Sequence, residues 1–226
     1  MRRGKSVYIS NDDDRRFPPG RMTIRSSEPA INLPPFTLAL ILANVCVFAV
    51  LKLLPNTMAW NAIDIFGFVP SRYSGDTAFS TAAIFAPVSY QFLHGDWIHL
   101  AVNMVSLAAF GAGIERHVGG GTMISVYLLC GILAAAAHFA VYPLSDDPVI
   151  GASGAIAGLM GGVLRLLRAS RAGLFRLAVV WGIATVALGF TGMPGDGGAQ
   201  IAWVAHLGGF AGGLLLFRVF LGRSGT

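Results

Sequence analysis

The sequence predicts an all-α membrane protein, folded as a bundle of six transmembrane helices with a re-entrant or interfacial first outside loop. The composition supports this, because 54% of the 226 residues are hydrophobic and 12% are charged, about half the charged share of a soluble domain. Uncharged apolar runs of about 17 to 25 residues, the length that crosses a bilayer, recur along the chain. The predicted spans are 36–54, 97–114, 122–142, 149–164, 177–193 and 199–217.

Residues 1–35 precede the first span, and they lack both hydrophobic periodicity and an apolar segment next to the basic start. We therefore expect a disordered cytoplasmic tail and no cleaved signal peptide. The membrane domain then covers 36–221, and residues 222–226 form a short cytoplasmic tail at the C-terminus.

Residues 77–93 are also uncharged, but they contain Pro87, Gln91 and several hydroxyl groups, and a span here would reverse every later helix. We predict an interfacial or re-entrant loop instead. Lys and Arg concentrate in the inside loops of multi-pass proteins. With this topology and a cytoplasmic N-terminus, only Lys52 and Arg72 of the 16 basic residues lie outside.

The net charge of +5 therefore lies mostly on one membrane face. Anionic lipid headgroups are the expected partner of that face, and nucleic acid is not. Arg-rich inner loops without a signal peptide fit a multi-pass protein of a bacterial inner membrane, with an organellar membrane left open. Cys46 and Cys130 each fall within a span, so no disulfide framework is expected.

Few polar groups lie within the spans, and none of them is a carboxylate. A pair of facing Asp residues and a His-Glu-x-x-His zinc motif are both missing, so neither a metal nor another cofactor is expected. The polar residues that remain include His99, Asn103, Ser153 and His206, on the second, fourth and sixth spans. These spans run in one direction, and at about 1.5 Å per residue all four lie roughly 3 to 10 Å below their outer ends. An ionisable ring at that depth indicates a functional site.

Glycines repeat every four residues along the fourth and sixth spans. The repeats are Gly154, Gly158 and Gly162 in the fourth span, and Gly208 with Gly212 or Gly209 with Gly213 in the sixth. Such small-residue faces let two helix backbones approach closely. This packing would bring Ser153 Oγ within about 2.6 to 3.2 Å of a ring nitrogen of His206, the distance at which a base activates a nucleophile.

Four motifs resemble those of the rhomboid intramembrane serine proteases, over about residues 36–220: "GASGAIAGLMG", "AHLGGFAGG", "FLHGDWIHLAVNM" and "GAGIERHVG". The resemblance implies that Ser153 is the nucleophile and His206 the general base, without a carboxylate. It also implies that His99 and Asn103 form an oxyanion site with the Ser153 N–H. The substrates would be single-span transmembrane proteins, cut in or near the membrane.

The sequence departs from the family pattern at two places. Ala157 replaces an aromatic residue that commonly stacks on the catalytic histidine, and Phe85-Ala86 replaces a Trp-Arg pair of the first outside loop. Both changes predict altered activity. Three further polar sites are expected to be structural: His94 as a loop-stabilising residue, Glu115-Arg116 as an ion pair or carbonyl cap, and His138 in contact with water or headgroups.

Two other functions stay open. One is a catalytically inactive rhomboid-like protein that binds membrane clients, although such a protein has little use for four polar groups at that depth. The other is a small transporter or channel, although the spans contain no carboxylate for ion coupling and no duplicated half-repeat is visible.

Overall fold

The structure is a computed structural model that describes residues 32–75, 79–167, 172–173, 175–176, 179–183 and 202–223. The chain divides into two units, Met1–Asn32 and Leu33–Thr226, and every named helix belongs to the second unit. The α-helices are α1 (Pro35–Leu53), α2 (Asn56–Phe66), α3 (Ser71–Ser74), α4 (Ala86–Ser89), α5 (Trp97–Val118), α6 (Gly120–Val141), α7 (Ser153–Leu166) and α9 (Trp203–Arg223). Two short 3-10 helices are η1 (Thr81–Ile84) and η2 (Tyr90–Phe92). Over the described residues the only strand-like pairing is one antiparallel bridge, so this part of the chain is all-α as predicted.

Three helices, α1, α5 and α6, are long and apolar enough to cross a membrane. Helix α7 is apolar but has only 14 residues. The protein is therefore an integral membrane protein, while the count of six spans stays a prediction. The predicted span 177–193 lies largely outside the described residues, which include only the helical stretch 179–183.

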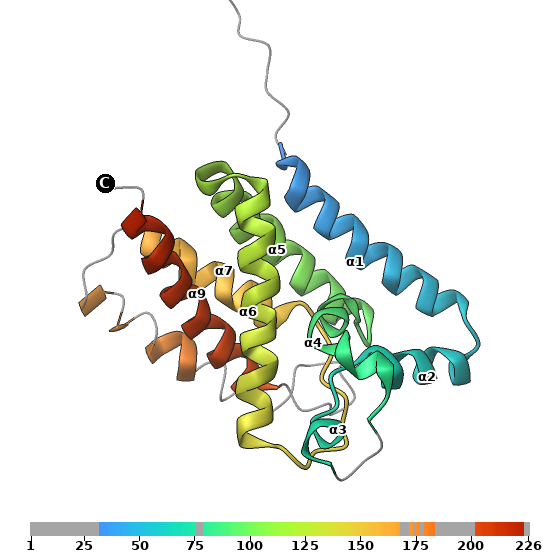
Figure 1. Cartoon of the computed structure of the whole chain (residues 1–226). Helices are drawn as coiled ribbons and strands as arrows, with labels where there is room; N and C mark the ends of the chain where they lie inside the picture. The colour runs from blue at the N-terminus through green and yellow to red at the C-terminus, as the bar shows by residue number, and fades with distance from the viewer. Residues whose placement is uncertain are drawn as a thin grey trace, which may run out of the picture. The chain divides into compact units, whose positions relative to one another are not determined.

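The long helices pack as a bundle, and in its C-terminal half α9 packs against two other helices. Helix α9 packs against α7 and α6, whereas α1 contacts α5 and α6 (Figure 1). Large apolar side chains fill the space between these helices, and they are almost fully buried. They include Phe48, Leu107, Ile114, Met123, Tyr127, Leu159 and Phe217.

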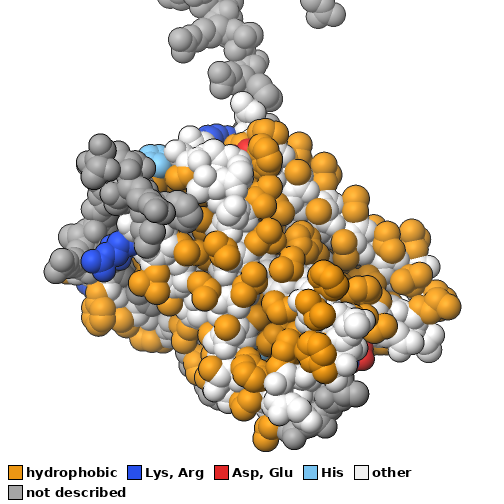
Figure 2. Space-filling view, in the orientation of Figure 1, with side chains coloured by type: hydrophobic (Ala, Val, Ile, Leu, Met, Phe, Trp, Pro, Cys, Tyr) orange, Lys and Arg blue, Asp and Glu red, His pale blue; other side chains and the backbone are white. Residues whose placement is uncertain are grey.

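The outer face of the bundle is also apolar. Figure 2 shows hydrophobic side chains spread over much of the face that α1 and α6 present. Exposed members on these two helices are Leu42, Val50, Leu129, Ile132 and Leu133. A soluble protein rarely exposes such a continuous apolar surface, and in a bilayer the lipid chains cover it.

The observed helix ends differ from the predicted span ends at several places. Helix α5 continues past residue 114 to Val118, α6 covers Gly120–Val141 instead of 122–142, and α7 begins at Ser153 instead of 149. Helix α9 covers Trp203–Arg223 instead of 199–217, whereas the predicted domain bounds stay a prediction. Hydropathy marks where apolar residues end, but helical hydrogen bonds continue through charged residues when these have partners.

Glu115, near the inner end of α5, has partners on α1. Its carboxylate accepts hydrogen bonds from the Phe36 N–H at 3.0 Å and from the N–H and hydroxyl of Thr37 at 2.6 and 2.7 Å. The first N–H groups of a helix have no intrahelical acceptor, and α1 has no side-chain cap of its own. Glu115 therefore caps amide groups of another helix, whereas the expected ion pair or carbonyl cap of Glu115-Arg116 stays a prediction.

The segment between α1 and α5, residues 54–96, is called the first loop here. Its described residues 79–92 form η1, α4 and η2 in place of one long helix, with Pro87 inside α4. Tyr90 and Gln91 are buried, whereas Phe79, Ile84 and Phe85 are exposed. The loop thus has one face on the bundle and another that is apolar and open, as an interfacial segment requires.

Candidate active site

Ser153 is the first residue of α7, and the chain reaches it through a short non-helical turn. Val149 pairs with Phe68 through two backbone hydrogen bonds of 2.9 and 3.0 Å. Gly151 has a φ of +117°, a conformation that is costly for residues with a Cβ. This glycine turns the chain from the extended segment into the helix. The late start of α7 follows from this turn and from the pairing with Phe68, and it leaves the Ser153 N–H without a helical acceptor.

His206 lies in the first half of α9, and its ring faces the start of α7. The Nε2 atom of His206 is 2.7 Å from Ser153 Oγ, although the two residues are 53 positions apart in the sequence. The close approach expected between these two side chains is thus present. Among the described residues no ion pair joins a carboxylate to His206, and the ion pair found links Arg72 to Asp64. A neutral imidazole at this distance can accept a hydroxyl proton.

The glycines of α7 and α9 allow this approach. A Cβ added to Gly209 would overlap the carbonyl oxygen of Gly154, and one added to Gly213 would overlap that of Gly158. The two backbones are therefore in direct contact. This settles which of the two alternative glycine pairs of the sixth span faces α7.

The other glycine pair of α9 also serves helix packing, but against α6. A Cβ on Gly208 would overlap Ala137, and one on Gly212 would lie 2.7 Å from a methyl carbon of Leu133. One pair of glycines thus packs against α7 and the other against α6. The helix is held close to α6 and α7 together, which keeps His206 at the level of Ser153.

His99 and Asn103 come from α5, whose N-terminus is capped by the Asp96 side chain accepting the His99 N–H at 2.8 Å. The His99 ring lies beside the turn before Ser153, because a Cβ on Gly151 would be 2.6 Å from His99 Nε2. Asn103 is 4% exposed, and its side-chain N–H donates to the His99 carbonyl oxygen at 3.1 Å. Thus α5 brings His99 to the site, whereas the hydrogen bond of Asn103 remains within its own helix. Their role at an oxyanion stays a prediction.

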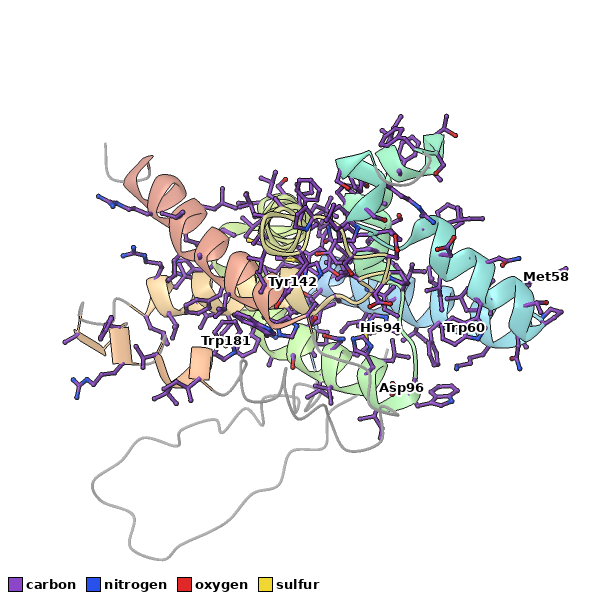
Figure 3. All side chains as sticks on the ribbon, turned by 90° about the horizontal axis from the view of Figure 1, so that it is seen from below. Met58, Trp60, His94, Asp96, Tyr142 and Trp181 are labelled. Carbon is purple, nitrogen blue, oxygen red and sulfur yellow. The ribbon has the colours of Figure 1, made fainter. Side chains whose placement is uncertain are left out.

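His94 lies in the first loop just before α5, near Asp96 (Figure 3). Its ring is 1% exposed and meets the His99 ring edge-on, with 4.9 Å between the ring centroids. Burial, together with the nearby His99, lowers the pKa of His94 to about 4. A neutral ring is therefore part of the wall that supports His99.

Two further expectations concern side chains around the site. His138 is only 9% exposed, and its ring lies 5.1 Å from that of Tyr142. The expected contact with water or headgroups stays a prediction. Ala157 is buried with 6% exposure. Trp181 stacks on Phe210 with ring centroids 4.6 Å apart, and Phe210 lies one helical turn after His206 in α9 (Trp181 in Figure 3).

The sequence reading did not single out Tyr90, whose backbone carbonyl accepts the Gly151 N–H at 2.9 Å. An aromatic residue in an apolar loop is typical of a membrane interface, so the presence of a tyrosine here did not indicate a hydrogen bond to Gly151. The structure places it at 1% exposure between the first loop, α6 and the start of α7.

These features define an α-helical integral membrane protein with a serine and a histidine from two helices in hydrogen-bond contact. The family model of the Rhomboid domain matches residues 82–223, more than half of the chain. The chain belongs to the rhomboid family.

Similar proteins occur in plants and bacteria. RHOMBOID-like protein 4 of Arabidopsis thaliana is 32% identical over 140 residues, which cover 60% of this chain and 34% of that protein. Rhomboid protease GluP of Bacillus subtilis is 34% identical over 123 residues, 54% of this chain and 23% of that protein. Rhomboid protease AarA of Providencia stuartii is 34% identical over 86 residues, 32% of this chain and 30% of that protein. The matched part therefore spans about a third or less of each of these relatives.

Proposed function

We propose that this protein is an intramembrane serine endopeptidase in which Ser153 and His206 form a catalytic dyad. The observation that carries the proposal is the distance of 2.7 Å between Ser153 Oγ and His206 Nε2. Two relatives named as rhomboid proteases, GluP and AarA, support the same reaction class. The catalytically inactive protein that binds membrane clients and the transporter remain alternatives, and the experiment below separates them.

In the proposed reaction His206 Nε2 takes the proton of Ser153 as Oγ attacks the carbonyl carbon of the substrate peptide bond. The Ser153 N–H, and donors from His99 and Asn103, would stabilise the negative oxygen of the tetrahedral intermediate. His206 then gives its proton to the leaving amine, and an acyl-enzyme remains on Oγ. Water, activated by the same histidine, hydrolyses this ester and restores the free serine.

The proposed substrates are single-span transmembrane proteins, cut in or near their membrane segment. A peptide carbonyl inside a helix is shielded from attack, so the substrate must unwind locally where it enters the site. We also propose that the chain has six spans, with a cytoplasmic tail at residues 1–35 and a membrane domain at 36–221. Its proposed location is a bacterial inner membrane. Anionic lipids would contact the basic cytoplasmic face.

The test is cleavage of a labelled model transmembrane substrate by the full chain in lipid vesicles. Ser153→Ala and His206→Ala should abolish cleavage. Matched controls are Ser125→Ala, which removes an exposed hydroxyl of α6 bonded to the Gly121 carbonyl, and His117→Ala at an exposed site of α5. Both controls should cleave like the wild type.

A fluorophosphonate probe tests the dyad without knowledge of the substrate. It should label Ser153 in the wild type and fail to label the His206→Ala variant, because the hydroxyl is then not activated. Equal cleavage by the wild type and both dyad variants would reject the proposal. Binding of membrane clients without cleavage or labelling would favour the inactive binding protein, and ion flux through vesicles without cleavage would favour the transporter.

A further inference from the structure

Gly151 and Gly154, on either side of Ser153, both lie beside one residue of the first loop, Tyr90. The Gly151 N–H donates to the Tyr90 carbonyl oxygen at 2.9 Å. A Cβ added to Gly154 would lie 3.4 Å from the Tyr90 hydroxyl oxygen. Tyr90 is 1% exposed, so one buried residue borders the chain before and after the proposed nucleophile.

The hydroxyl group of Tyr90 ties it to α6. It donates to the Gly131 carbonyl oxygen at 2.7 Å, across 41 positions in the sequence. The neighbouring side chain of Gln91 lies against the same turn of α6, because a Cβ on Gly131 would overlap its amide group. Glycine at position 131 therefore lets two adjacent residues of the first loop dock on one turn of the helix.

Neither the first loop nor the turn before Ser153 can hold its position alone. The helices η1, α4 and η2 contain four, four and three residues, and isolated helices of this length are unstable. The turn has its bridge to Phe68 and its bond to Tyr90, and Ala152 gives α7 no side-chain cap. The place of Ser153 relative to His206 thus depends on contacts with the first loop.

We propose that Tyr90 is a positioning residue for Ser153. Its hydroxyl holds the start of η2 on α6, and its carbonyl oxygen then holds the Gly151 amide and the turn that leads into α7. Tyr90 acts through these contacts and not on the substrate itself. The inference rests on the proposed function, because it assigns a role in presenting Ser153 to His206.

The test compares Tyr90→Phe with the wild type, as full chains in lipid vesicles. Loss of the hydroxyl should lower kcat and the rate of Ser153 labelling by the fluorophosphonate probe, on the order of 10- to 100-fold for a small misplacement of the nucleophile. The KM should change less than twofold, because the substrate contacts are kept. Hydrogen exchange should be faster in the peptide that contains Gly151.

Tyr127→Phe is the matched control. Tyr127 lies on α6, is fully buried, and its hydroxyl donates to the Gln91 carbonyl oxygen at 3.4 Å, whereas the Gly151 amide is bonded to Tyr90. Its variant loses a buried hydroxyl of the same kind. It should lower the unfolding temperature, while kcat, the labelling rate and exchange at Gly151 change much less than in Tyr90→Phe, because the stronger bond from the Tyr90 hydroxyl to the Gly131 carbonyl is kept.

The outcomes separate this inference from the proposed function. If the wild type is labelled at Ser153 and cleaves, and Tyr90→Phe retains kcat and labelling rate as Tyr127→Phe does, Tyr90 is only structural and the inference is wrong. If both variants lose activity in proportion to their folded fraction, the inference is also wrong. If the wild type shows neither labelling nor cleavage, the proposed function fails and the inference fails with it.

Discussion

Thr37 at the start of α1 donates two hydrogen bonds to the Oε2 atom of Glu115 on α5, from its N–H at 2.6 Å and from its hydroxyl at 2.7 Å. Thr37 is fully buried and Glu115 is 7% exposed. A charge in such a place is stable only when its oxygens have donors. The contact ties the first helix of the bundle to a residue 78 positions later.

Glu115→Gln should destabilise the fold. The amide group puts N–H donors against the N–H groups of α1, so at least one of the present bonds is lost. We expect the free energy of unfolding to fall by about 1.5 to 3 kcal/mol, the range for bonds to a charged group. The measurement is thermal unfolding in detergent micelles. Exposed His117→Gln, two residues later, is the control, and equal unfolding of both variants would contradict the capping role.

Gly209→Ala should separate α9 from α7, because the added methyl group would overlap the Gly154 carbonyl oxygen. Overpacking of this kind costs about 1 to 3 kcal/mol. The cleavage rate should fall by more than the loss of folded protein explains, because His206 moves with α9. The control is Gly113→Ala on α5, where the methyl group meets no atom within 4 Å. If Gly209→Ala is as stable and as active as Gly113→Ala, the direct backbone contact does not exist.

Asn103→Ala should lower kcat/KM about 100- to 1000-fold, the effect of losing one oxyanion donor. Asn103 bonds to its own helix in the free protein, so little stability should be lost. Asn44→Ala is a matched control, because Asn44 is also buried on a long helix and donates to the Leu40 carbonyl four residues earlier. If the two variants have equal kcat/KM, Asn103 does not stabilise the oxyanion.

Stability should fall on acidification because of His94. Its pKa is about 4 in the folded protein and 6.5 in the unfolded chain. Between these values the unfolded state binds the extra proton, so the stabilisation is complete above pH 6.5 and is lost as the pH falls toward 4. The loss amounts to about 3 kcal/mol. His94→Gln should weaken this pH dependence of the unfolding temperature, while exposed His117→Gln should leave it as in the wild type.

Much of the architecture was predictable because hydropathy and motif spacing are properties of neighbouring residues. The apolar runs placed α1, α5 and α6 within a few residues. The uncharged stretch with Pro87 was separable from a true span, because proline and polar groups disfavour a long helix in lipid. His206 stood out because an ionisable ring inside a span is costly, and Ser153 because it lies at the same depth and its motif resembles that of the rhomboid proteases.

The register between helices could not be predicted from the sequence. The pairs Gly208 with Gly212 and Gly209 with Gly213 have the same spacing, so either could have faced α7. The structure assigns the second pair to α7 and the first to α6. The choice depends on how three helices pack at once, which no single helix encodes.

By itself the sequence determined a helical membrane protein and the polar residues within its spans, since both follow from the local cost of placing side chains in lipid. Tertiary structure decided where α7 begins, what Glu115 caps, and which loop residue supports Ser153. Each of these depends on a hydrogen bond to a distant segment: Val149 to Phe68, Glu115 to Thr37, and Gly151 to Tyr90. A backbone group bonds to whichever partner the folded chain brings close to it. These three hydrogen bonds therefore form only when the helices have packed into the bundle.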